Sequence, residues 1–168
     1  MQIGWQQIGG TWYYMNASGA MVTGDVIIDG AMSSFASSGV WLGYAAPGWK
    51  LANGAWYYLA KGGVVQTGWL NLGNTWYYMN ASGVMQTGWQ MISNTWYYMS
   101  ASGAMQTGWL KVGNTWYYMS ATGAMQTGWL NLGGTWYYLN AGGAMVTDWQ
   151  YIGGVWYKFS ASGAWISN

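Results

Sequence analysis

The sequence contains no histidine and no cysteine, and its single proline stands at position 47. The absence of cysteine excludes a disulfide framework, and the joint absence of cysteine and histidine excludes the usual zinc and haem sites. A protein built without disulfides fits the cytosol and a bacterial secreted location equally well.

Charged side chains are almost as scarce. Four lysines and three aspartates give a net charge of +1, with no basic run. The chain therefore has no electrostatic footprint for nucleic acid or for an anionic membrane surface. No apolar run approaches the roughly 20 residues that cross a bilayer, so we expect no membrane insertion. The charged residues are Lys50, Lys61, Lys111, Lys158, Asp25, Asp29 and Asp148.

This inventory argues against catalysis. Without histidine, cysteine or glutamate, the usual general bases and nucleophiles are missing, and only three aspartates remain. Asp25 and Asp29 are four residues apart, a spacing that does not present a carboxylate pair to one substrate in a hairpin. We expect no enzymatic activity and no cofactor. Any catalysis by a full-length protein would lie in a domain outside these residues.

What the chain has in excess is aromatic side chains and glycine: 16 Trp, 15 Tyr and 28 Gly in 168 residues. They recur in steps of twenty residues. Residues 68–88, GWLNLGNTWYYMNASGVMQTG, show the unit, and copies follow at Trp89, Trp109, Trp129 and Trp149 and precede it at Trp49 and Trp5. A fixed short period predicts a stack of small units.

We interpret the chain as a single repeat domain over 1–168. Its repeats are 4–23, 24–47, 48–67, 68–87, 88–107, 108–127, 128–147 and a C-terminal capping repeat at 148–168. The second repeat is degenerate, with Asp25 and Met32 in the tryptophan positions and Ser33-Ser34 in place of the tyrosine pair. Four additional residues around Pro47 indicate a turn or small loop insertion. In the last repeat, Lys158 replaces the second tyrosine and Trp165 stands in the methionine position.

Each unit has the pattern of a β-hairpin. Two runs rich in β-forming residues, 69–72 and 75–79, flank a turn candidate at Gly73-Asn74. This register places Trp69, Trp76 and Tyr78 on one face of the hairpin, and Leu70, Leu72 and Tyr77 on the other. Because a lone hairpin is marginal in water, the units must stack. We predict an all-β solenoid, a superhelix of stacked β-hairpins, with a methionine in each bridging segment.

The pattern GW...GxTWYYMxxxGxMxTGW resembles the choline-binding, or cell-wall-binding, repeats of Gram-positive surface proteins, bacteriolytic enzymes and phage endolysins. The resemblance covers nearly the whole chain. It implies a superhelix of hairpins that binds choline on teichoic acid, in cages between consecutive repeats formed by two tryptophans, a tyrosine and an apolar wall. The aromatic face derived above carries the matching ring types, and such rings attract a quaternary ammonium.

Carried over to this sequence, the resemblance implies four cages. They are Trp49, Trp56 and Tyr78; Trp69, Trp76 and Tyr98; Trp89, Trp96 and Tyr118; and Trp109, Trp116 and Tyr138, with Met85, Met105 and Met125 as apolar walls. Two junctions depart from the pattern. The junction of Trp129 and Trp136 would meet Lys158, a cation that repels choline, and the junction of Trp5 and Trp12 would meet Ser34. We expect both to be silent.

The resulting hypothesis is a non-catalytic module, secreted and associated with the cell wall, that anchors a surface protein or lytic enzyme. Met1 opens directly on repeat material without a signal peptide, which is typical of a fragment or mature segment of a larger protein. Its expected partner is choline-bearing teichoic acid. An α-glucan-binding module and a structural spacer or stalk are the alternatives, and the oligomeric state, including a homodimer, is left open.

Overall fold

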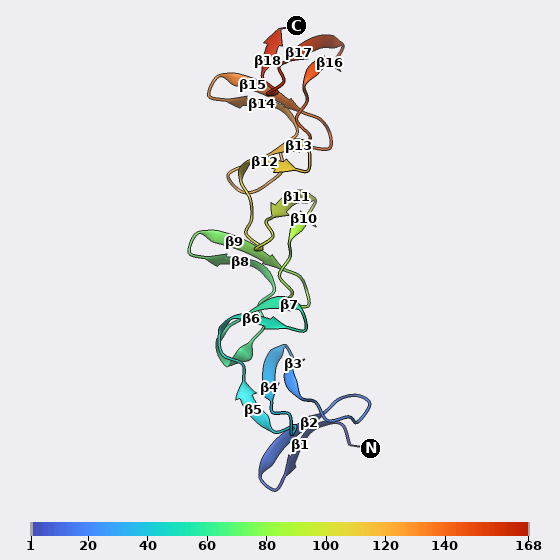
Figure 1. Cartoon of the computed structure of the whole chain (residues 1–168), viewed down its shortest axis with the longest axis vertical. Helices are drawn as coiled ribbons and strands as arrows, with labels where there is room; N and C mark the ends of the chain where they lie inside the picture. Colours follow the sequence, from blue (N-terminus) through green and yellow to red (C-terminus); the bar gives the residue numbers. More distant parts are fainter. Residues whose placement is uncertain (1, 168) are drawn as a thin grey trace. The chain divides into compact units, whose positions relative to one another are not determined.

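The computed structural model describes residues 2–167, which form β-strands joined by turns and one short 3-10 helix (Figure 1). The expectation of an all-β fold of repeated hairpins is confirmed. None of the helices in the described part is long and apolar enough to span a bilayer. The elements are β1 (Gly4–Ile8), β2 (Thr11–Met15), β3 (Gly24–Ile28), β4 (Ala31–Phe35), β5 (Trp41–Tyr44), β6 (Gly48–Ala52), β7 (Ala55–Leu59), η1 (Lys61–Gly63), β8 (Gly68–Leu72), β9 (Thr75–Met79), β10 (Gly88–Ile92), β11 (Thr95–Met99), β12 (Gly108–Val112), β13 (Thr115–Met119), β14 (Gly128–Leu132), β15 (Thr135–Leu139), β16 (Asp148–Ile152), β17 (Val155–Phe159) and β18 (Trp165–Ser167).

The chain divides into two compact units, one up to Gln86 and one from Thr87. Each unit is described by itself below. The repeat boundaries given above remain a prediction.

A two-residue turn closes each hairpin. In the β8–β9 hairpin, Gly73 and Asn74 have φ angles of 56° and 71°. Positive φ at both central residues defines a type I′ turn, whose twist matches that of the flanking strands. Ser93 adopts the same conformation with φ of 48°, although its side chain makes this geometry less favourable than it is for glycine. The hairpin therefore imposes the type I′ conformation even on Ser93, a residue type that disfavours a positive φ.

The strand register is the predicted one. Trp69 pairs with Tyr78, Leu70 with Tyr77, and Asn71 with Trp76. The corresponding pairs recur in the later hairpins, for example Trp89 with Tyr98. Because directly paired residues share a face, each hairpin with the full aromatic pattern has one face with both tryptophans and the second tyrosine, and an opposite face with the first tyrosine.

From β3–β4 onward, each hairpin has a buried core residue at the end of its second strand. Met79, Met99 and Met119 are completely buried, and each pairs with a glycine of the first strand. They lie on the face that also carries the first tyrosine, the face predicted to be the packing side. Phe35, Leu59, Leu139 and Phe159 are the buried residues at the same position in other hairpins.

The segment after each hairpin folds back on its second strand. In most repeats it forms an isolated bridge, such as Met79 with Met85. In two repeats it lengthens into a third strand, β5 or β18, where Phe35 pairs with Trp41 and Phe159 with Trp165. The turn or loop insertion predicted around Pro47 lies between β5, which ends at Tyr44, and β6, which begins at Gly48. Pairing with β4 supplies partners for the backbone of Tyr44.

Replacing a buried core methionine should destabilise the protein far more than replacing an exposed one in the same hairpin. We expect Met99→Ala to cost about 2–5 kcal/mol, because it removes a completely buried side chain and leaves a cavity. Met91, which is 52% exposed, provides the matched control. Thermal and urea unfolding of Met99→Ala and Met91→Ala measure the difference. Equal midpoints for the two variants would contradict the assignment of Met99 to the core.

Candidate functional site

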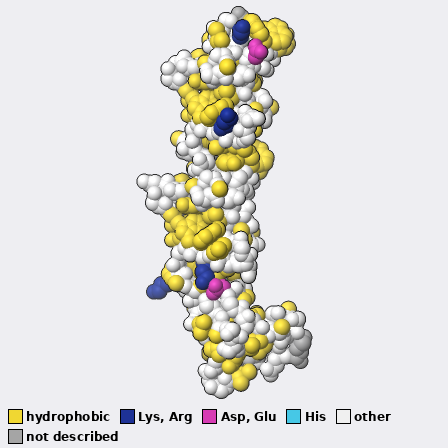
Figure 2. Space-filling view, in the orientation of Figure 1, with side chains coloured by type: hydrophobic (Ala, Val, Ile, Leu, Met, Phe, Trp, Pro, Cys, Tyr) yellow, Lys and Arg dark blue, Asp and Glu magenta, His cyan; other side chains and the backbone are white. Residues whose placement is uncertain are grey.

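The most conspicuous exposed side chains are tryptophans. The tryptophan of the second strand is 45% exposed at Trp56, 39% at Trp96, 40% at Trp116 and 41% at Trp136. Figure 2 shows hydrophobic side chains gathered in patches, with few charged side chains in view. Leaving large apolar rings in water at the same place in successive repeats is unfavourable, and such patches are typical of binding surfaces.

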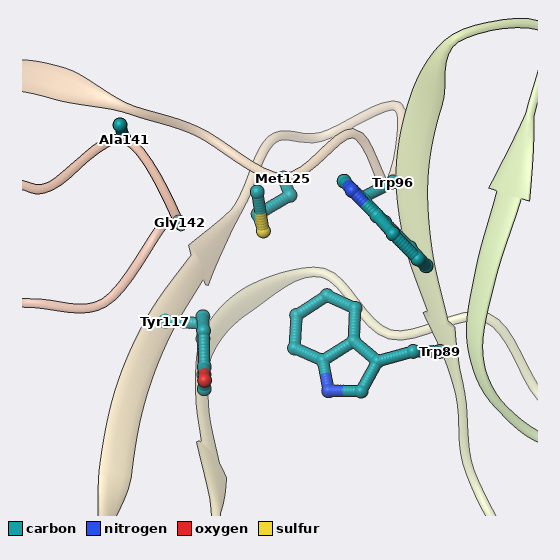
Figure 3. A pocket seen from close by; sticks show the side chains of 6 residues that line it. All are labelled: Trp89, Trp96, Tyr117, Met125, Ala141 and Gly142. Atoms are coloured by element: carbon teal, nitrogen blue, oxygen red, sulfur yellow. The ribbon is translucent and has the colours of Figure 1, made fainter.

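Figure 3 shows one of these surfaces from close by. Trp89 and Trp96 belong to one hairpin, Tyr117 to the next, and Met125 to the segment that follows it. The rings of Trp96 and Tyr117 lie on opposite sides of Trp89, and the thioether of Met125 closes a further side (Figure 3). The Trp89 centroid is 6.1 Å from that of Trp96 and 4.8 Å from that of Tyr117.

The rings form walls because they meet at steep angles. The Trp89 plane makes 87° with Trp96 and 68° with Tyr117. This arrangement encloses a cavity of about 330 Å³, which Ala141 and Gly142 of the following turn also line. We call such a group an aromatic cage: two tryptophans from one hairpin, a tyrosine from the next hairpin, and a side chain from the segment after it.

The cage recurs within each unit. In the second unit, a cavity of about 280 Å³ is lined by Trp109, Trp116, Tyr137, Met145 and Ser162. In the first unit, Trp49 lies 6.5 Å from Trp56 and 4.9 Å from Tyr77, measured between ring centroids. The rings again meet at steep angles, 86° and 67°. The same 20-residue pattern therefore builds the same cage at separate junctions.

A backbone hydrogen bond positions the methionine wall. The N–H of Met125 donates to the carbonyl of Trp96 at 2.8 Å, and Met85 and Met145 bond in the same way to Trp56 and Trp116. The Met125 side chain also lies against Gly143, where an added Cβ would clash with its sulfur. Glycine is required there for this close approach and for its φ of +79°.

The cage linings define the chemistry. No lysine or aspartate lines the cavity of Trp89 or the cavity of Trp109. Aromatic faces carry partial negative charge, so several of them around one space attract a cation that needs no hydrogen bond. Within residues 2–167, no three His, Cys, Asp or Glu side chains come together as a metal site would require.

At three of the four predicted cages, the tyrosine that faces the two tryptophans is the residue before the predicted one. Tyr117, instead of the predicted Tyr118, lines the cavity of Trp89. Tyr118 packs against Trp109 of its own hairpin, with 5.2 Å between centroids. The other corrected pairs are Tyr77 for Tyr78 at Trp49, and Tyr137 for Tyr138 at Trp109.

The physical reason is that stacked hairpins meet through opposite faces. The tryptophan face of one hairpin contacts the other face of the next, which carries the first tyrosine. The second tyrosine lies on the tryptophan face of its own hairpin, directly paired with a tryptophan. The predicted register already separates the two tyrosines by face, and the predicted cages take the tyrosine of the tryptophan face, whereas the structure places the tyrosine of the opposite face beside the neighbouring tryptophans.

One predicted cage draws on residues of both units and stays a prediction. Within the first unit, Trp69 lies 6.2 Å from Trp76 and 5.2 Å from Tyr78. Within the second unit, Tyr98 packs against Trp89 at 5.1 Å. Met105, its predicted wall, lies against Gly123.

The junction expected to be silent because of Lys158 contains a complete cage. Its cavity of about 340 Å³ is lined by Trp129, Trp136, Tyr157 and Trp165. Lys158 instead pairs with Trp149 in its own hairpin, and its ammonium lies 5.5 Å from the Trp149 ring centroid. The signal for this cage was present in the sequence, since Trp165 occupies the methionine position of the repeat.

The first junction departs from the repeat pattern at a different residue from the predicted one. Ser33, and not Ser34, takes the position of the cage tyrosine, and its buried hydroxyl has no partner among the described residues. Trp41 stands in the methionine position, 5.4 Å from Trp5, which is 6.3 Å from Trp12. Aromatic rings gather here without the tyrosine wall.

The second junction is closed by packing and by an ion pair. Met32, in a tryptophan position, is buried in a cluster with Ala45, Ala52 and Leu59. Asp25 replaces the other tryptophan, accepts a hydrogen bond from the Ser34 hydroxyl at 2.7 Å, and pairs with the Lys50 ammonium at 2.9 Å. The Ser34 bond and then Lys50 lower the pKa of Asp25 against the effect of its partial burial. This junction has a core where other junctions have a cage.

Models of known protein families match the repeats of this chain. A model described as the choline-binding repeat matches residues 3–41, 86–127 and 126–168, and a model described as a cell wall binding repeat matches 48–65 and 67–85. No curated protein matches the chain.

Solved structures from Streptococcus pneumoniae have a similar fold. CbpJ is 32% identical with a TM-score of 0.71, over 98% of this chain and 81% of that protein. Choline-binding protein F, solved in the presence of a peptidoglycan analogue, is 35% identical with a TM-score of 0.72, over 99% of this chain. The same protein in complex with ipratropium is 34% identical with a TM-score of 0.70, over 99% of this chain and 60% of that one.

This chain spans 58% of choline-binding protein F in the structure with the peptidoglycan analogue. The family models together match well over half of the residues, and they include the hairpins that build the cages. The chain therefore belongs to the choline-binding repeat family.

Proposed function

We propose that this chain is a non-catalytic module that holds a larger surface protein or lytic enzyme on the cell wall by binding the choline groups of teichoic acid. The observation that carries the proposal is the cage of Trp89, Trp96, Tyr117 and Met125, a space walled by three rings and a thioether. A trimethylammonium group carries a full positive charge and no N–H donor, so ring faces can replace its water. Each cation–π contact contributes about 0.5–2 kcal/mol, more as water is excluded.

Anchoring follows from repetition of the cage. A single cage of this kind has few contacts and is expected to bind choline in the millimolar range. Several cages on one chain face a polymer that repeats its ligand, so a second binding event has a high effective concentration. The gain in avidity requires no new contact, and weak sites are sufficient for attachment.

The alternative function, carbohydrate binding, has less support, because of the polar side chains beside the rings. Sugar recognition needs free donors and acceptors near the aromatic platform. Gln90 donates to the carbonyl of Thr87 at 2.8 Å, and Asn131 accepts from the N–H of Gly134 at 3.1 Å. Each of these side chains thus uses one of its polar atoms in a bond to nearby backbone.

Choline should stabilise the full chain, and an isomaltooligosaccharide should not. A ligand that binds only the folded state raises the unfolding temperature as its concentration exceeds its dissociation constant. We expect thermal unfolding to shift upward at tens of millimolar choline chloride, with sodium chloride at the same ionic strength as the control. Trp96→Ala should reduce the shift. Stabilisation by the sugar alone would favour the glucan-binding alternative, and no response to either ligand would favour a spacer.

The tyrosine assignment can be tested by a matched pair of variants. Tyr117→Ala removes a wall of the Trp89 cage and should weaken choline binding there by about 2- to 30-fold, the equivalent of one cation–π contact. Tyr118→Ala leaves that wall in place. Choline-soaked crystals of both variants measure the occupancy of this cage. An empty cage in Tyr118→Ala and a filled one in Tyr117→Ala would contradict the assignment.

Lys111 should weaken one cage by charge repulsion. Its ammonium lies 5.8 Å from the centroid of Trp116, a wall of the cage with Trp109 and Tyr137. A second cation at this range in water costs a few tenths of a kcal/mol, so Lys111→Asn should raise choline affinity of this cage by about twofold at low salt. Lys61→Asn changes the net charge equally and serves as the control. An equal response of this cage to both variants in a site-resolved NMR titration would exclude a local effect of Lys111.

A further inference from the structure

The last cage of the described chain differs from the others in one wall. At the other cages the wall after the tyrosine is a methionine, held by a backbone bond to the preceding hairpin. At the last cage this position is Trp165. The cavities of Trp89 and Trp109 are also lined by residues of a following turn, whereas only Trp129, Trp136, Tyr157 and Trp165 line the last one. Every side of this cavity that the protein supplies is therefore aromatic.

The four rings are arranged as walls. Trp129 lies 6.2 Å from Trp136, 4.9 Å from Tyr157 and 6.3 Å from Trp165, with interplanar angles of 82°, 72° and 78°. Tyr157 and Trp165 are 6.3 Å apart at 66°. A methionine wall contributes mainly dispersion, which is almost indifferent to the charge of the ligand. An indole wall adds an electrostatic attraction that only a cation receives, and tryptophan is the strongest of the aromatic residues in this respect.

Trp165 is held in place by β18. It pairs with Phe159, which is buried and whose ring lies 5.7 Å from Trp129. Its indole N–H donates to the carbonyl of Ser167 at 2.8 Å. Because this polar group already has a partner, the ring offers the cavity an apolar surface with no donor to satisfy. The ammonium of Lys158 lies against Trp149, so it does not occupy the cage.

Resting on the proposed function, we propose that the cage of Trp129, Trp136, Tyr157 and Trp165 is the tightest quaternary-ammonium site among the described cages. Trp165 is the residue that sets its preference for a permanent positive charge over a neutral group of the same shape. This cage fills first as the ligand concentration rises. The cages with methionine walls fill later and discriminate less between a cation and its neutral counterpart.

The test is a site-resolved titration of the full chain. Indole N–H resonances of the tryptophans, assigned by single Trp→Phe variants, follow each cage separately by NMR. The ligands are choline and its neutral carbon analogue, 3,3-dimethylbutan-1-ol. We expect the last cage to bind choline about 2- to 30-fold more tightly than the Trp89 cage, the effect of one additional cation–π contact. Its ratio of choline affinity to alcohol affinity should be higher by a similar factor.

Variants of the wall residue separate a specific role from a structural one. Trp165→Met introduces the residue found in the other cages and should lower both the choline affinity and the charge preference of the last cage to their level. Trp165→Phe keeps an aromatic face and should retain part of both. The amide spectrum shows whether Trp165→Met unfolds the last hairpin. If it does, Trp165→Phe and the comparison between cages in the unmodified chain still test the role of Trp165.

The outcomes distinguish this inference from the proposed function. A last cage that binds choline no more tightly than the Trp89 cage, or that keeps its charge preference in Trp165→Met, would overturn the inference while choline binding stands. No response of any cage to choline would overturn the proposed function itself. Equal binding of choline and the neutral alcohol at every cage would show that the sites select shape and not charge.

Discussion

A two-stranded hairpin cannot bury the side chains on both of its faces, and this constraint governs the whole structure. Each hairpin here hides a small core, such as Met99, at the end of its second strand. The next hairpin covers its tryptophans only in part, and Trp96 remains 39% exposed. Stability therefore depends on the junction between hairpins, where the tryptophan face of one meets the tyrosine of the next. The candidate binding site and the packing interface are the same surface.

This double role explains why the junctions vary so widely in one chain. Where the position of the second tryptophan holds Met32, the junction is filled and Asp25 is paired with Lys50 and Ser34. Where both tryptophans are present, rings that meet steeply cannot stack closely, and a cavity of roughly constant size remains. Packing that is incomplete in this way supplies the space for a ligand. A perfectly packed junction would be more stable and would have no cage.

The chain also shows how a repeat ends without a following neighbour among the described residues. An interior methionine wall is supported from outside by the glycine of a later turn, as Met125 is by Gly143. At the last cage Trp165 is supported by the strand pairing of β18 and by its own hydrogen bond to Ser167. The last cage therefore has a rigid ring on a paired strand as its wall, where an interior cage has a flexible methionine packed against a turn.

Sequence alone determined the elements of this fold. The 20-residue period, the Gly-Asn turn and the alternation of side chains were enough to place the two strands of each hairpin, their register and the two faces, because these depend on local backbone geometry, whereas the third strands β5 and β18 were not predicted. The ring types of the cage, and its methionine, followed from resemblance to a family. The second repeat could be recognised as degenerate because it lacks the two tryptophans.

The tertiary structure decided which residues meet. Which tyrosine reaches a neighbouring tryptophan depends on how consecutive hairpins face each other, so Tyr117 lines a cage and Tyr118 does not. For the same reason Lys158 points to its own hairpin, and Trp165 completes a cage that was expected to be silent. Positions within a hairpin are set by neighbours a few residues away, whereas a cage joins residues about thirty positions apart, whose approach depends on the packing of whole hairpins.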